Sequence, residues 1–431
     1  MPNEFFRASL LQPWPSFIDI SNAVVTLANN DFTYDGTEKE QGVISVVLGN
    51  EVLVERTDYV VCGQYGVQSG KYTIIIYGIG KYRGIITKRW YIKKATGSIT
   101  VEENNIETSI IDTVEIAVTS VVGDGEIEVS SSDDDIAIAN YENGIVTITP
   151  IEMGNVTINV TLKEGENYLG NSTTIEAVIV GPSAILAENS PALIQIAAKK
   201  GIGSTLWSVG DVTALISVGA FAAISSATSI RAYIIGFDHN SGVEGDGITF
   251  QFGRKTATGS NLAFVDAAYG KSNTSAGYYF NMHNSNVIAW RSTRMRNIIC
   301  SIFFDALPLE WQKVIKTITK YTDNTGMNSS SSTSANVTAT KERIFLLAEY
   351  EVFGTRIDAN TYEKNRQKHY SYYSNGNSRK KYKHNSSTNT CWWWLRSPGT
   401  QRTFCCVDTN GGASANSPSY VCGFAPAFVV G

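Results

Sequence analysis

The four histidines and six cysteines are the residues whose spacing could support metal binding or thiol chemistry, and neither set forms such a pattern. The cysteines contain no Cys-x-x-Cys pair, and none has zinc-ligand spacing with His239, His283, His369 or His384. The chain also has no Gly-x-Ser-x-Gly turn, no glycine-rich phosphate loop and no His-Glu-x-x-His pair. We therefore expect no metal, no cofactor and no enzyme activity, and we interpret each histidine as a surface or packing residue.

Four of the cysteines lie near the C-terminus, as Cys391, Cys405, Cys406 and Cys422. Neighbouring residues of a strand point to opposite faces, so Cys405 and Cys406 are poorly placed to share a metal or a disulfide. A bond between Cys405 and Cys422 is left open by their spacing, and nothing else in the sequence supports it.

The composition excludes several classes of partner. The net charge is −5 and no half of the chain is basic, so nucleic acid is not expected as a partner. The basic cluster at residues 379–384 is interpreted as a solvated loop rather than a phosphate site. No apolar run approaches the roughly 18 residues of a membrane span, and the first residues lack a signal-peptide pattern. Only 17% of residues are charged, whereas Tyr (21) and Gly (37) are frequent, which favours a β-rich protein that binds through polar and aromatic contacts.

An N-terminal segment, 1–18, is followed by two segments that share one sequence pattern. Residues 19–95 and 96–181 alternate short runs rich in Val, Ile, Tyr and Thr with turn signals, which predicts two small antiparallel sandwiches. Each ends in a related phrase, Gly80-x-Tyr82-x-Gly84 and Gly165-x-x-Tyr168-x-Gly170, so the pair indicates a degenerate repeat. We interpret both tyrosines as packing residues. Both segments resemble bacterial immunoglobulin-like domains, a likeness that implies a spacer or an adhesive stalk.

Residues 182–431 have a mixed pattern and are predicted to form an α+β domain. The runs LWSVGDV, RAYIIGF, ITFQFG and LAFVDAAYG indicate strands. Apolar residues at helical spacing predict one helix over 292–305 and a second over 308–317, with Pro308 at its start.

The C-terminal forty residues contain a frame of large apolar residues. Trp393, Trp394 and Leu395 begin it, and Phe404, Val407 and Phe428 follow on short predicted strands, so all should be core. One tryptophan of Trp392–Trp394 is left open as a sugar-stacking surface. Arg396 lies inside this apolar run and, if buried, must pair with backbone carbonyls or a carboxylate.

The phrases Trp393-Trp394-Leu395-Arg396-Ser397-Pro398 and Gly423-x-x-Pro426-Ala427-Phe428 resemble a bacterial and phage domain of C-type-lectin-like, formylglycine-generating-enzyme-like fold. Many members of that family are variable proteins of diversity-generating retroelements, in which adenines near the 3′ end of the gene are randomised. The family often has Arg between the final Gly and Pro, which this chain lacks.

The residues between these anchors have a restricted alphabet. Lys, Glu, Gln, Met and Trp are absent from Arg402–Gly431, and these are the amino acids that codons ending in a pyrimidine cannot encode. Randomised Asn codons would give this pattern, and an ordinary loop rich in Gly, Ser and Asn is the alternative. We predict a variable ligand-binding region at about 399–422. Its expected contact residues alternate with the anchors and are exposed: Thr400, Arg402, Thr403, Cys406, Asp408, Asn410, Ser414, Asn416, Ser417, Ser419 and Tyr420.

These expectations combine into one hypothesis: a phage virion or tail adhesin that binds a host cell-surface protein or glycan. We expect multicopy display or a homo-oligomer, because a small binding face gains avidity when many copies act together. A bacterial surface or cytoplasmic scaffold protein of fixed specificity is the alternative. The third alternative is an oxidase of the formylglycine-generating class. Enzymes of that class use a pair of cysteines to bind copper, and the adjacent Cys405 and Cys406 are poorly placed to form such a pair.

Overall fold

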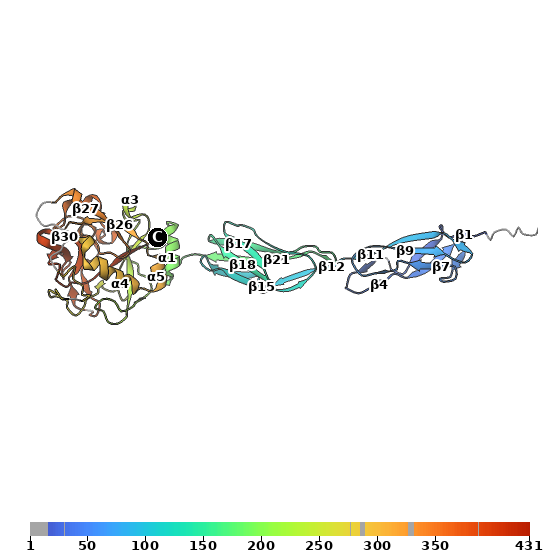
Figure 1. Ribbon diagram of the computed structural model, residues 1–431, viewed down its shortest axis with the longest axis horizontal. Helices are drawn as coiled ribbons and strands as arrows, with labels where there is room; N and C mark the ends of the chain where they lie inside the picture. Colours follow the sequence, from blue (N-terminus) through green and yellow to red (C-terminus); the bar gives the residue numbers. More distant parts are fainter. Residues whose placement is uncertain (1–15, 30, 276, 285–288, 326–331, 387) are drawn as a thin grey trace, which may run out of the picture. The chain divides into compact units, whose positions relative to one another are not determined.

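The computed structural model describes residues 16–29, 31–275, 277–284, 289–325, 332–386 and 388–431. The chain divides into two compact units, Met1–Val180 and Gly181–Gly431, which we describe separately. The described part of the first unit consists of strands and loops, and the second unit combines strands with short helices (Figure 1). The protein is therefore multidomain and mostly β. The predicted N-terminal segment 1–18 lies almost entirely outside the described residues.

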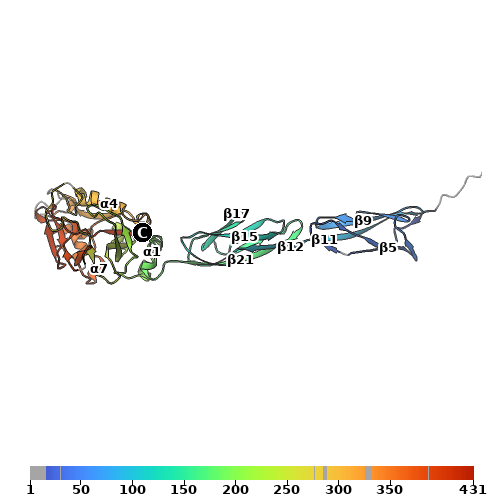
Figure 2. The ribbon, with the colours of Figure 1, turned by 90° about the horizontal axis from the view of Figure 1, so that it is seen from below.

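The first sandwich of unit one packs the sheet β3-β11-β9-β7 against the sheet β2-β5-β6. Val25 and Val46 of one sheet share a core cluster with Ile76 and Ile86 of the other, and Figure 2 shows β9 and β5 on opposite sides of it. Apolar and polar residues alternate along these strands, so one face of each is buried. The strands are β1 Ile18–Asp19, β2 Val24–Leu27, β3 Asp31–Thr33, β4 Lys39–Glu40, β5 Val43–Leu48, β6 Glu51–Leu53, β7 Tyr59–Cys62, β8 Tyr65–Gly66, β9 Gly70–Gly78, β10 Tyr82–Arg83 and β11 Ile85–Lys93.

The second sandwich has the sheets β13-β15-β18-β17 and β14-β21-β19-β16. Val146 and Ile148 of one sheet and Ile158 and Val160 of the other are fully buried. The strands are β12 Ala95–Thr96, β13 Ser98–Val101, β14 Asn105–Ser109, β15 Val114–Val122, β16 Ile127–Ser131, β17 Ala137–Glu142, β18 Ile145–Pro150, β19 Gly154–Leu162, β20 Tyr168–Leu169 and β21 Asn171–Val180.

The two sandwiches share one feature of their strand pairing at the repeated phrases. In each sandwich the opening strand pairs in parallel with the short strand that carries the repeated tyrosine: Ile18 is opposite Tyr82, and Ala95 is opposite Tyr168. Tyr82 is fully buried. Tyr168 is half-buried and packs edge-on against Tyr34, with 5.4 Å between ring centroids. Both tyrosines therefore pack against the protein, as interpreted from the sequence.

The second unit is arranged around the sheet β22-β23-β24-β33, with the smaller sheets β25-β28-β29, β30-β31-β32 and β26-β27 beside it. The last strand returns to pair antiparallel with β24, which brings Phe428 opposite Phe250. The strands are β22 Ile216–Val218, β23 Thr228–Phe237, β24 Ile248–Arg254, β25 Leu262–Ala263, β26 Ile318–Asp323, β27 Val337–Glu342, β28 Lys381–Lys383, β29 Thr390–Cys391, β30 Trp393–Gly399, β31 Thr403–Val407, β32 Ala413–Asn416 and β33 Ala427–Val430.

The helices of the second unit are short. They are α1 Pro191–Lys199, α2 Gly203–Leu206, α3 Ser241–Glu244, α4 Cys300–Asp305, α5 Leu309–Val314, α6 Glu349–Phe353 and α7 Ser371–Ser374. The helix predicted over 292–305 is present in shortened form, as a π-helical turn at Met295–Ile299 that runs into α4. The second predicted helix is α5, and Pro308 is its N-cap.

Two parts of the prediction for this unit are wrong. The run LWSVGDV is not a strand, because Leu206 ends the helix α2 and the Asp211 carboxylate accepts the Ser208 N–H (2.8 Å) to close a turn. The helix α1 was not predicted. Its N-cap is Ser190, whose hydroxyl accepts the Leu193 N–H (3.3 Å), and Pro191 follows as the first helical residue.

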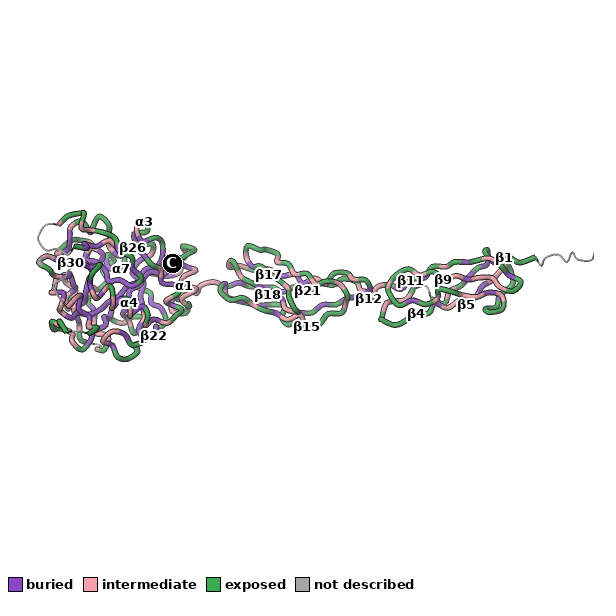
Figure 3. The backbone as a smooth tube through the Cα atoms, viewed as in Figure 1, coloured by how far each residue is buried: buried purple, intermediate pink, exposed green. Residues whose placement is uncertain are grey.

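The core of the second unit has two clusters. The larger contains Phe250, Phe303 and Trp394, and the smaller contains Trp393 and Leu395. Because successive residues of β30 enter different clusters, this strand is buried on both faces, and Figure 3 shows the backbone around its label in the colour of buried residues.

Candidate ligand-binding face

The predicted frame of the C-terminal region is buried. All seven residues of β30 are buried, and the indole N–H groups of Trp393 and Trp394 donate to the carbonyls of Arg379 (3.0 Å) and Phe280 (2.8 Å). Phe404, Val407 and Phe428 are fully buried as well. The prediction that these residues form core is confirmed.

Arg396 is fully buried and is paired with both kinds of partner that the sequence required. Its guanidinium donates two hydrogen bonds to the Glu351 carboxylate (2.6 and 2.7 Å), one to the Leu346 carbonyl (2.9 Å) and one to the Thr322 hydroxyl (2.9 Å). Burial disfavours both charges, but the attraction between Arg396 and Glu351 outweighs it, raising the pKa of Arg396 and lowering that of Glu351. Arg396 is thus a structural residue.

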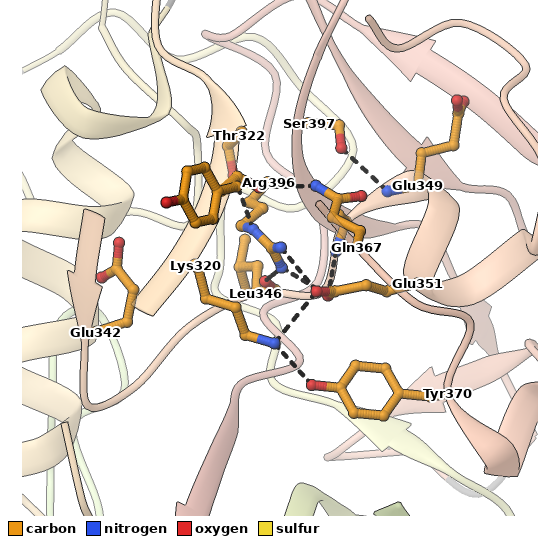
Figure 4. A network of polar contacts seen from close by, with 12 residues as sticks. Lys320, Thr322, Glu342, Leu346, Glu349, Glu351, Gln367, Tyr370, Arg396 and Ser397 are labelled. Atoms are coloured by element: carbon orange, nitrogen blue, oxygen red, sulfur yellow. Dashed lines mark hydrogen bonds and ion pairs between the residues drawn. The ribbon is translucent and has the colours of Figure 1, made fainter. Parts of the chain in front are cut away.

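A second buried cation shares the same carboxylate (Figure 4). The Lys320 ammonium lies 2.8 Å from Glu244, 3.1 Å from Glu351 and 2.8 Å from the Tyr370 hydroxyl. The ring of His239 stacks on Tyr370 with centroids 3.6 Å apart.

This arrangement gives three residues the spacing of a metal site. Ligand atoms of His239, Glu244 and Glu351 lie within 4.8 Å of one another. The Lys320 ammonium already bonds both carboxylates, so it supplies the positive charge that a metal would otherwise bring. Burial, together with nearby Lys320, lowers the pKa of His239 to about 3, and the ring is neutral at pH 7. We interpret the cluster as structural, and His239 as the packing residue that was predicted.

The predicted binding region forms a short helical turn and a hairpin. Thr400–Arg402 make the turn, and β31 and β32 are the hairpin strands. The Asp408 carboxylate accepts the N–H groups of Asn410 (2.7 Å) and Gly412 (2.9 Å), which fixes the loop between the strands. Asp408 therefore has a structural role, and Asn410 is exposed at the tip.

Ten of the eleven predicted contact residues are exposed or half-buried, and they lie on the turn, on the hairpin and on the segment after it. They are Thr400, Arg402, Thr403, Asp408, Asn410, Ser414, Asn416, Ser417, Ser419 and Tyr420. Thr400 is partly engaged, because its hydroxyl donates to Asp358 (2.6 Å).

Cys406, the eleventh, was wrongly predicted to be exposed. Its side chain is fully buried, as is that of Cys405. β31 is the central strand of its sheet: Cys405 packs in the smaller core cluster and Cys406 in the larger. The expected alternation of faces is therefore present, but both faces are covered. All six cysteines are free thiols, so Cys405 does not pair with Cys422.

Three half-buried aromatic residues, Tyr269, Trp392 and Tyr420, lie together at this region, and of these only Tyr269 was missed. Trp392 is the one tryptophan of 392–394 that is not buried, and its backbone N–H donates to the Tyr269 hydroxyl (2.9 Å). The Lys383 ammonium lies 4.4 Å from the centroid of the Tyr269 ring, and the Tyr420 hydroxyl donates to the Gly270 carbonyl (2.9 Å).

These aromatic residues come together because residues 270–273 run beside 419–421. The Val421 N–H donates to the Lys271 carbonyl (3.0 Å), and the Asn273 N–H donates to the Ser419 carbonyl (2.8 Å). Aromatic residues with a polar end dominate the energetics of many binding surfaces. The sequence indicated two members of the group, because Tyr420 was a predicted contact residue and one tryptophan of Trp392–Trp394 was left open as a sugar-stacking surface.

We define the candidate ligand-binding face by the ten exposed or half-buried contact residues named above, which include Tyr420, together with Tyr269 and Trp392. It contains no paired catalytic groups among the described residues, and its chemistry is that of hydrogen bonding and aromatic contact.

Comparison with known proteins gives one family match. Residues 269–431 match a family described as a domain of unknown function (DUF6273), and this range contains the whole ligand-binding face. No curated protein matches the chain. In the part of the chain that the structure describes, no helix is long and apolar enough to span a bilayer.

Several solved structures share limited similarity. Domains 4 and 5 of the S-layer protein SbsC are 14% identical over 37% of this chain and 98% of that structure, with a TM-score of 0.20. Murine CEACAM1b is 13% identical over 37% of this chain and all of that one (100%), with a TM-score of 0.19. BT4661, a SusE-like surface-located polysaccharide-binding protein from Bacteroides thetaiotaomicron, is 12% identical, and the match covers 36% of this chain and 34% of that one at a TM-score of 0.17. At such scores these likenesses do not bear on function.

Proposed function

We propose that this chain is a non-catalytic binding protein whose C-terminal domain has a C-type-lectin-like fold. The observation that carries the proposal is the division within one sheet: the Trp393–Pro398 frame is buried, whereas β32 is half-exposed and small or polar, as are Ser417 and Ser419 after it. A rigid frame beside an adaptable polar and aromatic surface is an arrangement suited to recognition.

The restricted alphabet of residues 402–431 supports diversification of this face by a retroelement. The ligand in this proposal is a host cell-surface protein or glycan, and the chain acts at the surface of a phage particle, with the two sandwiches of unit one as spacers. Display in several copies would add avidity to a small contact area.

Sequencing the 3′ end of the gene in close relatives tests the diversification. We expect substitutions at exposed or half-exposed positions such as Asn410, Ser414 and Asn416, constancy at the buried frame, and a reverse transcriptase gene nearby. Identical C-termini without such a gene would refute diversification and favour a surface protein of fixed specificity.

Binding is tested with the labelled full chain on a panel of bacterial cells and on a glycan array. Changing four face residues to Ala should abolish binding: Asn410, Asn416, Ser417 and Ser419. The matched control changes four exposed polar residues of the second sandwich: Ser120, Ser130, Asn171 and Ser172. Binding that survives the first set, or that the control abolishes equally, would place recognition elsewhere. Copper-dependent oxidation of a cysteine peptide by the chain would contradict a non-catalytic role.

A further inference from the structure

A small cleft of about 210 Å³ opens between α4 and β27, in the second unit. It shares no residue with the ligand-binding face. Its wall on the helix side includes Ser301 and Phe304, and its wall on the strand side includes Lys341 and Arg343.

The cleft has an excess of positive charge. Arg296, Lys341 and Arg343 line it, and Glu342 is the one acidic residue of the lining. The Glu342 carboxylate is buried and already accepts hydrogen bonds from Arg296 Nε (2.7 Å) and Trp290 Nε1 (3.0 Å). The three cations and the one carboxylate, which is already hydrogen-bonded, give the cleft a local charge of +2. The net charge of the whole chain is −5.

Arg343 is held in place without using its hydrogen-bond donors. Its guanidinium carbon lies 3.9 Å from the centroid of the Phe304 ring, in the geometry of a cation–π contact. Among the described residues it makes no hydrogen bond and no ion pair. A guanidinium stacked on a ring keeps the N–H groups of its edge available, which is the arrangement that binds carboxylate or phosphate in a bidentate manner.

The neighbouring groups are fixed by contacts of their own. Arg296 also donates to Asn297 Oδ1 (2.8 Å) and to the Lys341 carbonyl (3.0 Å). The Lys341 ammonium donates to the Thr319 hydroxyl (2.7 Å), which leaves it two further donors. Burial raises the pKa of the Cys300 thiol, which lines the cleft, so this residue adds no negative charge.

We propose that this cleft binds a small oxyanion, the phosphate or carboxylate group of a small ligand, with Arg343 as its principal donor and Lys341 as the second. The volume supports a single anionic group, because clefts for larger organic ligands usually measure about 300–1,000 Å³. This site is independent of the proposed ligand-binding face.

Calorimetric titration of the full chain with inorganic phosphate, and separately with succinate, tests the proposal and distinguishes phosphate from carboxylate. We expect saturable one-site binding of at least one anion, with a Kd on the order of 1 mM or below at low salt. Arg343→Gln should weaken it at least about tenfold. Arg343→Lys keeps the charge but loses the planar fork, so the loss should be smaller.

The matched control is Lys313→Gln, which removes an exposed cation of α5 outside the cleft. It should leave the Kd unchanged. Lys341→Gln gives a second cleft variant in case Arg343→Gln alters the fold, which the thermal unfolding of each variant would show. Absence of saturable binding by both anions, or equal weakening by Lys313→Gln and the cleft variants, would overturn the proposal.

Discussion

The two outer strands of the sheet β30-β31-β32 differ in almost every respect, although both pair with the same central strand. All residues of β30 are buried, with large apolar side chains and the ion-paired Arg396. All four residues of β32 are half-buried and small or polar. We therefore expect that changes in β30 cost much stability, whereas the surface of β32 can change at little cost.

The largest expected effect on the buried side comes from Glu351→Ala. The change leaves Arg396 and Lys320 buried without their shared carboxylate, and breaking a buried pair in this way costs about 3–5 kcal/mol. Denaturant unfolding followed by tryptophan fluorescence measures it, since six of the eight tryptophans lie in the second unit and only Trp14 and Trp90 lie outside it. The exposed Glu310→Ala on α5 is the control. A loss below about 1 kcal/mol would show that the network is not what stabilises β30.

Two tryptophans at the start of β30 extend this contrast, because Trp394 lies in the strand and Trp392 lies just before it. Trp394→Ala should cost about 3–5 kcal/mol, because it leaves a cavity in the larger core cluster. Trp392→Ala should cost less and should weaken ligand binding, because Trp392 is half-buried on the ligand-binding face. Denaturant unfolding and cell binding are measured for both variants. Equal losses of stability would contradict the assignment of Trp394 to the core and of Trp392 to the ligand-binding face.

The buried network should also give the second unit a pH dependence. The pKa of His239 is lowered to about 3 in the fold from 6.5, so the unfolded chain binds a proton that the folded chain does not. Stability should therefore fall as the pH drops from 6.5 toward 3, by about 2 kcal/mol between pH 7 and pH 5.

The variant His239→Gln isolates this contribution. Burial raises the pKa of Glu363 to about 7, which has the opposite effect and lowers the stability of the fold as the pH rises from 4.5 to 7. This effect is the same in the wild type and in His239→Gln, so it cancels in their difference. The difference between wild type and variant should thus shrink toward low pH. A constant difference across that range would mean that His239 has the same pKa in the fold as in the unfolded chain.

The frame could be predicted from the sequence because its signals are local. A run of large apolar residues on a short strand indicates a core, and an arginine inside such a run requires a partner. The partner itself could not be predicted, since Glu351 lies 45 positions from Arg396 and Lys320 lies still further along the chain. The helix α1 was missed, although its Ser-Pro start is a local signal.

The exposure of residues in the proposed binding region was predicted less completely, for a reason that concerns the sheet. Alternation along a strand indicates which residues share a face, but it does not show whether a face is covered by other parts of the chain. Cys406 was assigned to the surface for this reason. Tyr269 was missed because it reaches the face from a segment more than a hundred residues away, through its bond to Trp392.

The smallest effect, and the finest test of the comparison, is a matched pair of substitutions at Cys406 and Ser414. These residues lie directly opposite each other on β31 and β32. Cys406→Phe forces a ring into the filled larger core cluster, which should cost about 1–3 kcal/mol. Ser414→Phe places the same ring on the half-exposed edge strand and should change the stability by only about 0.5 kcal/mol or less. Denaturant unfolding of both variants gives the result. Equal costs would mean that β32 is as constrained as the strand beside it, and a face that cannot accept new side chains could not be the variable surface of a binding protein.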